Sequence, residues 1–215
     1  MGSNVSKVPT LIKVAVCSVA QLLNGKRIKA ENQTYIQGEL SIPEYQRPYV
    51  WGEKQIAKLI DDLKEHQQQF NDSPYYLGSV ILHAHNGKLN IIDGQQRLTT
   101  LALLGYLNDE LNDVALSYHS SVSIQQIRRN LEHLEKVHHE WAKVIDFSNI
   151  IISLVVTESE DDAYKFFETQ NTGGVRLTGP DIIKAHHLRA VPKDYRNHYA
   201  KEWEDLGELQ GIVMT

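Results

Sequence analysis

The amino-acid sequence predicts an α/β (α+β) fold, and three observations carry this prediction. Apolar residues recur at helical spacing over residues 53–70 and again over residues 98–111. Two β-rich runs meet at Asn86-Gly87, the strongest short-range signal for a β-hairpin. The second half of the chain has mostly helical patterns, interrupted by one β-rich run over residues 149–157.

Composition limits the classes of protein that fit. The chain has 215 residues, 41% of them hydrophobic and 23% charged, and no apolar run approaches the ~20 residues that cross a bilayer. We therefore expect a cytoplasmic protein that does not bind membranes. The single cysteine, Cys17, excludes an internal disulfide. The formal net charge of −5 argues against an extended basic groove for nucleic acid.

The elements before the hairpin have recognisable limits. Ser18 is expected to cap a short helix that ends at Asn24-Gly25, and residues 35–42 read as a strand closed by Pro43. The following stretch, IPEYQRPYVW, predicts a stiff aromatic loop. The helix over residues 53–70 then presents one apolar face, made of Ile56, Leu59, Ile60, Leu63 and Phe70.

The hairpin delivers the chain into Asp93-Gly94, and a strongly apolar helix begins directly afterwards. Its buried face is expected to consist of Leu98, Leu101, Leu104, Leu107 and Leu111. The stretch IIDGQQRLTTLALL is therefore a strand, a tight turn at Gly94 and the first turn of a buried helix. Free backbone amides and the positive end of the helix dipole make such a junction suited to anions.

The rest of the chain is expected to be mainly helical. Residues 123–141 read as a helix with Ile124, Ile127, Leu131 and Leu134 on its apolar side, and residues 158–169 as a helix with Ala163, Phe166 and Phe167 facing inward. A loop containing Asn171 to Gly174 follows. Thr178 and Asp181 then have the spacing of a capping box at the start of another helix.

The cluster Asp93, Gln95, Gln96 and Arg97 allows two interpretations. As a nucleotide-phosphate site, Gly94 permits close approach, the glutamines supply amide contacts and Arg97 pairs with phosphate. Asp93 would then hold a divalent cation, orient Arg97 or position a water molecule. As a structural feature, Asp93 caps the helix and Arg97 makes an ion pair.

Two other stretches also allow both a functional and a structural interpretation. In YQRPYVW, the aromatic residues could stack on a base while Arg47 reaches phosphate, or the loop could cover a core. The loop from Asn171 to Gly174 could approach a ligand closely or simply end a helix. The ten histidines lack the spacing of a zinc helix, so a metal–histidine site is not predicted.

Four stretches carry a resemblance when they are taken in order. IPEYQRPYVW, YLGSVIL, IIDGQQRLTTL and FFETQNTGGVRLTGPDIIKA resemble successive signatures of the GmrSD-type restriction family, in its GmrS-like N-terminal domain, domain of unknown function 262. The resemblance implies a ParB/sulfiredoxin-like small mixed sheet with packed helices, over residues 1–115, and a mainly helical portion over residues 116–215. The two portions are expected to form one compact unit.

The resemblance also implies a nucleotide site. Asp93, Gln95, Gln96 and Arg97 would be catalytic, with Asp93 as the ligand of Mg²⁺. The nucleotide-binding residues would be Tyr45, Gln46, Arg47, Gly94, Thr99, Asn171, Gly174, Asp181 and Lys184.

The expected function is Mg²⁺-dependent binding and hydrolysis of a nucleoside triphosphate, in a regulatory domain of a modification-dependent (type IV) restriction or phage-defence system. Nothing after Ala190 resembles the His-Asn-His nuclease domain that relatives add, so the nuclease is expected in a partner or a further domain. A homodimer is also possible. The alternatives are a module that reads modified DNA without turnover and a scaffold for a partner nuclease.

Overall fold

The computed structural model describes residues 11–43, 46–70, 73–111, 116–118, 120–142 and 145–172, and side chains through residue 167. Contacts divide the chain into two units, Met1–Thr169 and Gln170–Thr215. In chain order the elements are β1 (Ile12–Ser18), α1 (Val19–Leu23), β2 (Ile28–Lys29), β3 (Tyr35–Ile36), β4 (Glu39–Ser41), α2 (Glu53–Phe70), β5 (Tyr75–His85), β6 (Lys88–Asp93), α3 (Gln95–Leu107), α4 (Ser121–Lys136), α5 (His138–Trp141), β7 (Ile150–Thr157) and α6 (Glu160–Thr172).

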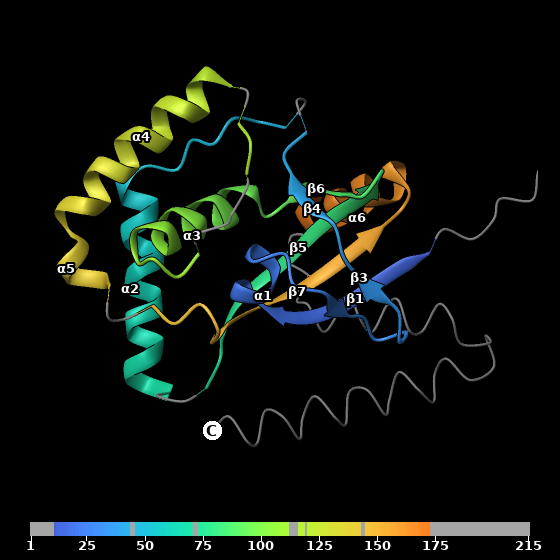
Figure 1. Ribbon diagram of the computed structural model, residues 1–215, viewed down its shortest axis with the longest axis horizontal. Helices are drawn as coiled ribbons and strands as arrows, with labels where there is room; N and C mark the ends of the chain where they lie inside the picture. Colours follow the sequence, from blue (N-terminus) through green and yellow to red (C-terminus); the bar gives the residue numbers. More distant parts are fainter. Residues whose placement is uncertain are drawn as a thin grey trace, which may run out of the picture. The chain divides into compact units, whose positions relative to one another are not determined.

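These elements confirm the predicted α/β class (Figure 1). The main sheet has five strands in the order β1-β7-β5-β6-β4, with both parallel and antiparallel neighbours. β7 comes from the second half of the chain, yet it pairs with β1 on one side and with β5 on the other. Residues on both sides of position 115 therefore build the same sheet.

The predicted hairpin is confirmed. β5 and β6 pair antiparallel, and the turn between them consists of Asn86 and Gly87 with positive φ angles of 49° and 76°. Two central residues with positive φ are what a type I′ turn requires, because its twist matches that of the flanking strands. The hairpin fixes where Asp93 leaves the sheet.

The strand expected over residues 35–42 is wrong in its extent. The chain instead forms β3, which pairs with β2, and β4, which pairs parallel with β6. Gly38 lies in the interruption, and an added Cβ there would lie 2.8 Å from the carbonyl oxygen of Gly87. The backbone passes the hairpin turn so closely that a side chain has no room.

The N-terminal segment forms more structure than the sequence analysis predicted. β1 is an edge strand of the main sheet, and α1 follows it directly. The predicted cap is confirmed, since Ser18 accepts a hydrogen bond from the Gln21 amide and Gln21 reaches back to the Ser18 amide. This is a complete capping box.

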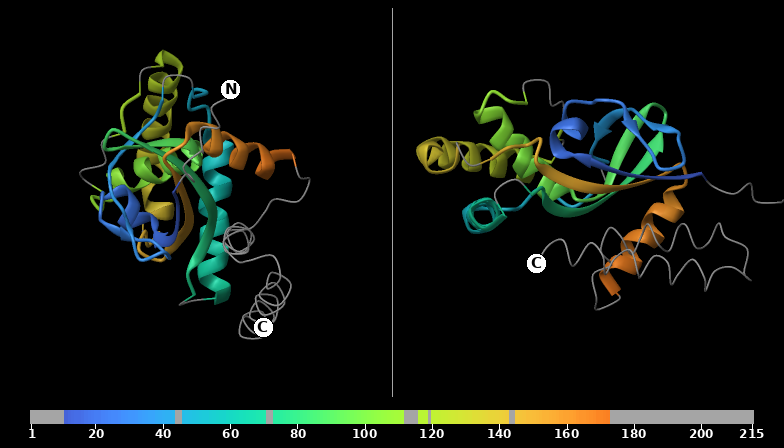
Figure 2. Two further views of the ribbon diagram at one scale, coloured as in Figure 1. Left: turned by 90° about the vertical axis from the view of Figure 1, so that its right-hand side faces the viewer. Right: turned by 90° about the horizontal axis from the view of Figure 1, so that it is seen from below.

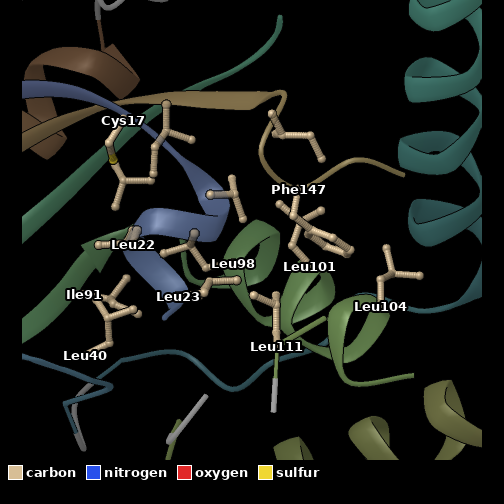
Figure 3. Packing of buried hydrophobic residues seen from close by; sticks show 14 of the residues in the cluster. Cys17, Leu22, Leu23, Leu40, Ile91, Leu98, Leu101, Leu104, Leu111 and Phe147 are labelled. Carbon is tan, nitrogen blue, oxygen red and sulfur yellow. The ribbon is translucent and has the colours of Figure 1, made fainter. Parts of the chain in front are cut away.

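The main hydrophobic core contains buried residues of the sheet and of the helices α1, α2 and α3. α2 has the predicted bounds, and its buried residues are Ile56, Leu59, Ile60 and Leu63. Phe70 is 49% exposed, so its predicted place on the buried face is wrong. Figure 3 shows Leu98, Leu101 and Leu104 of α3 among side chains of α1 and Phe147, and Leu111 is buried beyond the end of α3.

α4 differs from its prediction in the face that it buries. Ile124, expected on the apolar side, is 38% exposed, whereas Ser123 and Asn130 are buried together with Leu134. The helix also stops at Lys136, and α5 is a separate short helix. A helix that buries polar side chains needs hydrogen-bond partners for them, and the loop described below supplies these partners.

α6 lies on the face of the sheet opposite α1 and α3 (Figure 2). It begins near the predicted position and buries Ala163, but it extends through Thr172, so Asn171 and Thr172 belong to the helix rather than to the predicted loop. Among the described residues, no helix is long and apolar enough to cross a membrane.

Candidate functional site

The junction between β6 and α3 has the predicted strand–glycine–helix form. Gly94 is the N-cap of α3 and has a φ angle of 97°. A Cβ at this position would also lie 2.8 Å from Cγ2 of Val80, so both the backbone conformation and the close approach require glycine. No side chain caps the α3 N-terminus, so Asp93 does not act as the helix cap.

The next three residues point to three different neighbours, because successive helical side chains are separated by about 100°. Gln95 lines a pocket. Gln96 contacts the backbone of residues 48–51, and Arg97 contacts the backbone of β5. Residues adjacent in the motif thus meet different parts of the fold.

Arg97 is bound to the sheet. Its Nη1 donates to the carbonyl oxygen of Leu77 at 3.1 Å, and its Nη2 donates to the carbonyl oxygen of Ser79 at 2.8 Å and to Oδ2 of Asp93 at 3.2 Å. The residue between these carbonyls is Gly78, with φ +113°, where the register of β5 against β7 shifts. An added Cβ there would lie 2.6 Å from Nη1 of Arg97. The guanidinium group therefore packs directly on the bulge and pairs with Asp93, which is the structural interpretation of these two residues.

Gln96 holds the aromatic loop. Its Oε1 accepts hydrogen bonds from the amides of Val50 at 3.0 Å and Trp51 at 3.2 Å, while its Nε2 donates to the carbonyl oxygen of Pro48 at 3.0 Å. The side chain is only 5% exposed. The Gln96 carboxamide thus provides hydrogen-bond partners for two backbone amides and one backbone carbonyl of the loop.

The loop is also fixed from α4. The Tyr49 amide donates to Oγ of Ser123 at 2.9 Å, and Gln126 and Asn130 both donate to the carbonyl oxygen of Trp51. Tyr49 is fully buried, so its ring cannot stack on a nucleobase. These contacts hold residues 49–51 of the loop between α3 and α4.

A chain of hydrogen bonds crosses the interior behind this loop. Nδ2 of Asn130 donates to the Tyr49 hydroxyl at 3.0 Å, and the Thr100 hydroxyl donates to the Gln96 carbonyl at 2.9 Å. Since the Thr100 proton is used, the Tyr49 hydroxyl is the donor in its 2.9 Å bond to Thr100. Burial raises the pKa of Tyr49, and its bonds to Thr100 and Asn130 partly oppose this shift. Tyr49 therefore keeps its proton at neutral pH.

A pocket of about 310 Å³ lies between the loop, the first turn of α3 and the beginning of α4. Its apolar lining is Ile42, Pro43, Pro48 and the ring of Tyr118, and its polar lining is Gln46, Arg47, Gln95, Ser120 and Ser123. The described lining thus contains one cation and no carboxylate. Apolar walls with a few polar groups are typical of small-molecule sites.

Gln95 is the unusual member of this lining. Its side chain is 5% exposed, and its Oε1 atom has no hydrogen-bond partner among the described residues. Leaving a buried polar atom without a partner costs about 1–3 kcal/mol. Such an atom beside a pocket points to a ligand or a bound water molecule as its partner.

Two other lining groups, Gln46 and Tyr118, have protein partners that fix them. Gln46 donates to the carbonyl oxygen of Ile92 at 3.0 Å, and the Tyr118 hydroxyl donates to Oγ1 of Thr99 at 2.7 Å. Thr99 is 1% exposed and lies behind Tyr118, so it supports the wall of the pocket. Burial raises the pKa of Tyr118 well above its ordinary value.

The structure brings together three residues that the sequence analysis assigned to the nucleotide site, namely Gln46, Arg47 and Gln95. It places Asp93, Gln96 and Arg97 in the contacts described above, outside this lining. Tyr45, Gly174, Asp181 and Lys184 lie outside the described residues, and of Asn171 only the backbone, in α6, is described.

Sequence reasoning missed Tyr118, Ser120 and Ser123. Ser120 caps α4 by accepting from the Ser123 amide at 3.5 Å, so the helix begins before the predicted start. A serine three residues before another at the start of an amphipathic helix was a usable signal for the cap. Nothing in the sequence indicated that this helix end faces a pocket.

The described residues contain no group of three or more histidine, cysteine, aspartate or glutamate side chains that could hold a metal ion. Asp93, the predicted Mg²⁺ ligand, pairs with Arg97, and both side chains are partly exposed, 29% and 23% respectively. The described residues that line the pocket therefore do not fit a resident Mg²⁺ ion.

Comparison with protein families gives one match. The model of the GmrSD restriction endonuclease N-terminal domain matches residues 19–188, which include the aromatic loop, the β6–α3 junction and the pocket. Among curated proteins there is no match. The family match agrees with the resemblance carried by the four motifs, and the chain belongs to the GmrSD restriction endonuclease family, matching its N-terminal domain.

Proposed function

We propose that this chain binds a nucleoside triphosphate in the pocket beside Gln95 and hydrolyses it, as the regulatory domain of a modification-dependent restriction or phage-defence system. The family supports a role in restriction. One observation carries the nucleotide: Arg47 and Gln95 come from two separate predicted motifs and line the same pocket.

The chemistry of the pocket suits such a ligand. Its apolar lining accommodates a sugar or base, and Arg47 supplies the positive charge that phosphates need. Tyr118 presents its ring, because its hydroxyl is bonded to Thr99. The pocket volume of about 310 Å³ is at the lower end of the range for small-molecule sites.

Hydrolysis would rest on positioning. Gln95 is the motif residue whose buried amide oxygen has no partner among the described residues, so it is the group that would orient an attacking water molecule. Mg²⁺ enters as the counter-ion of the nucleotide, with its ligands from phosphates and water, since Mg²⁺ usually keeps several waters when bound to a nucleotide. Asp93 and Arg97 would then act on hydrolysis only indirectly, because their contacts fix the position of the α3 N-terminus that carries Gln95.

The test is phosphate release from ATP, GTP, CTP and UTP with Mg²⁺, together with the shift in melting temperature that each nucleotide causes. Gln95→Ala should lose turnover and keep the fold, because it removes a side chain whose oxygen makes no hydrogen bond to a described residue. Gln68→Ala, at an exposed glutamine of α2, is the matched control and should behave like the wild type.

Two results would count against this function. If no nucleotide is hydrolysed and none raises the melting temperature of the wild-type chain, the proposal fails. If nucleotide turnover persists undiminished in Gln95→Ala, the pocket is not where hydrolysis occurs. Salt-dependent binding of modified DNA in the absence of any nucleotide effect would favour the DNA-reading alternative.

A further inference from the structure

The pocket is bordered by the beginning of α4. Ser120, the N-cap, and Ser123, in the first turn, both line it. α4 is 16 residues long, has no acidic residue in its first turn and has His133 and Lys136 in its last turn. The first amides of a helix have no intrahelical partner and carry a partial positive charge, which favours anions.

Two further features at the same pocket point to a ligand. Arg47 is exposed and lines the pocket with no carboxylate among its described neighbours in the lining. The buried oxygen of Gln95 has no partner among the described residues. An amide oxygen needs a hydrogen-bond donor, and a phosphate group at neutral pH offers oxygen acceptors rather than donors. The pocket therefore contains separate groups for an anion and for an uncharged donor.

The serine hydroxyls can serve the anion. Oγ of Ser123 accepts from the Tyr49 amide at 2.9 Å, and Oγ of Ser120 accepts from the Ser123 amide at 3.5 Å. In both contacts the serine oxygen is the acceptor, and neither hydroxyl donates to another described residue, so each could donate to a phosphate oxygen. The helix end thus offers hydroxyl and amide donors together.

Arg97 does not offer free donors for a phosphate in this pocket. Its guanidinium group already donates to the carbonyl oxygens of Leu77 and Ser79 and to Asp93. It also lies two residues after Gln95, which on a helix corresponds to about 200° and thus to the opposite side of α3. A phosphate bound beside Gln95 would be on the other side of the helix.

We propose that the triphosphate binds at the N-terminus of α4, against Ser120, Ser123 and Arg47, while Gln95 accepts a hydrogen bond from the attacking water molecule. Asp93 and Arg97 hold the β6–α3 junction and do not contact phosphate. This inference rests on the proposed nucleotide function and assigns its parts.

The sharpest test changes one charge at constant shape. Asparagine and aspartate are both good N-caps, so Ser120→Asn and Ser120→Asp should each keep α4 folded, with aspartate favoured by the helix dipole. Aspartate, however, places a carboxylate where the phosphate is proposed to bind. Ser120→Asp should lower the affinity for inorganic triphosphate about tenfold or more, whereas Ser120→Asn should change it by about threefold at most.

A second pair of variants tests the cation. Arg47→Ala should weaken the binding of inorganic triphosphate and of each Mg²⁺-nucleotide about tenfold. Arg128→Ala removes the same charge from an exposed position of α4 outside the pocket lining and should change affinity by about twofold at most. Calorimetric titration of the full chain measures both, and urea unfolding of every variant checks the fold.

The outcomes separate this inference from the proposed function. If nucleotides bind and turn over but neither Ser120→Asp nor Arg47→Ala weakens them, the phosphate subsite is wrong and the function stands. If inorganic triphosphate shows the expected pattern and no nucleotide binds more tightly than it, the subsite stands and the nucleotide function falls. If neither ligand binds the wild type, both are overturned.

Discussion

Replacing Arg97 by methionine should destabilise the fold, because the guanidinium group joins the first turn of α3 to β5. The substitution keeps the aliphatic stem and removes donors to the carbonyl oxygens of Leu77 and Ser79 and to Asp93. The two carbonyl acceptors flank the bulge at Gly78, where the guanidinium packs against the backbone.

The magnitude follows from these three bonds. A hydrogen bond from a charged group contributes about 1.5–3 kcal/mol, but the Arg97 side chain is 23% exposed, so water will replace part of what is lost. We expect a loss of about 2–3 kcal/mol in the free energy of unfolding. Asp93→Asn removes only the ionic part of a partly exposed pair and should cost about 0–1 kcal/mol.

Urea unfolding of the full chain measures the difference. With a slope typical of a protein of this size, Arg97→Met should lower the midpoint by about 1 M. Arg128→Met, at an exposed position of α4, is the control and should leave the midpoint unchanged. A midpoint for Arg97→Met within about 0.2 M of the wild type would refute the structural role of Arg97.

Three other predictions concern single positions. Gly78→Ala should cost about 2 kcal/mol in urea unfolding, because φ is +113° and the new Cβ would displace Arg97. Tyr49→Phe should cost about 1–2 kcal/mol, because it removes the hydroxyl between Asn130 and Thr100. Burial raises the pKa of Cys17 from 9.0 to about 12, so the unfolded chain loses this proton first and stability should fall as the pH rises from 9 toward 12.

Each of these has a matched control. Gly25→Ala shares a positive φ, +61°, but has nothing within 4 Å of the new Cβ, so it should cost less than Gly78→Ala. Tyr106→Phe, at a tyrosine that is 61% exposed, should have almost no effect. Cys17→Ala should remove the cysteine contribution to the alkaline loss of stability. Equal costs within either pair, or an unchanged alkaline slope in Cys17→Ala, would contradict the corresponding prediction.

The parts of the fold that depend on local sequence could be predicted. Asn86-Gly87 specifies its own turn, and the periodicity of α2 and α3 specifies a buried face. The close approach of Gly38 to the hairpin turn could not be predicted, since Gly87 is far away in the sequence. β1 depends in the same way on β7, its partner from far along the chain. The likeness to the ParB/sulfiredoxin fold stays a prediction.

The sequence motifs contain several residues of the candidate site, but they do not indicate what each residue contacts. Arg47 and Gln95, from two of the motifs, line one pocket, and their role as a nucleotide site stays a prediction. The motifs gave no way to see that Gln96 would serve the loop or that Arg97 would serve a β-bulge, because those partners are backbone atoms that carry no sequence signature. The buried polar face of α4 was hidden for the same reason: Ser123 and Asn130 pair with that loop.

The single helical turn that carries Gln95, Gln96 and Arg97 has a mechanical consequence. The three side chains leave the same short backbone segment. A ligand that displaced Gln95 would therefore also alter the hydrogen bonds from Gln96 to the loop and from Arg97 to β5. The pocket lining is thus connected through this one turn to the aromatic loop and to β5. If the pocket binds its proposed ligand, a displacement of this turn would reach the loop and the sheet together.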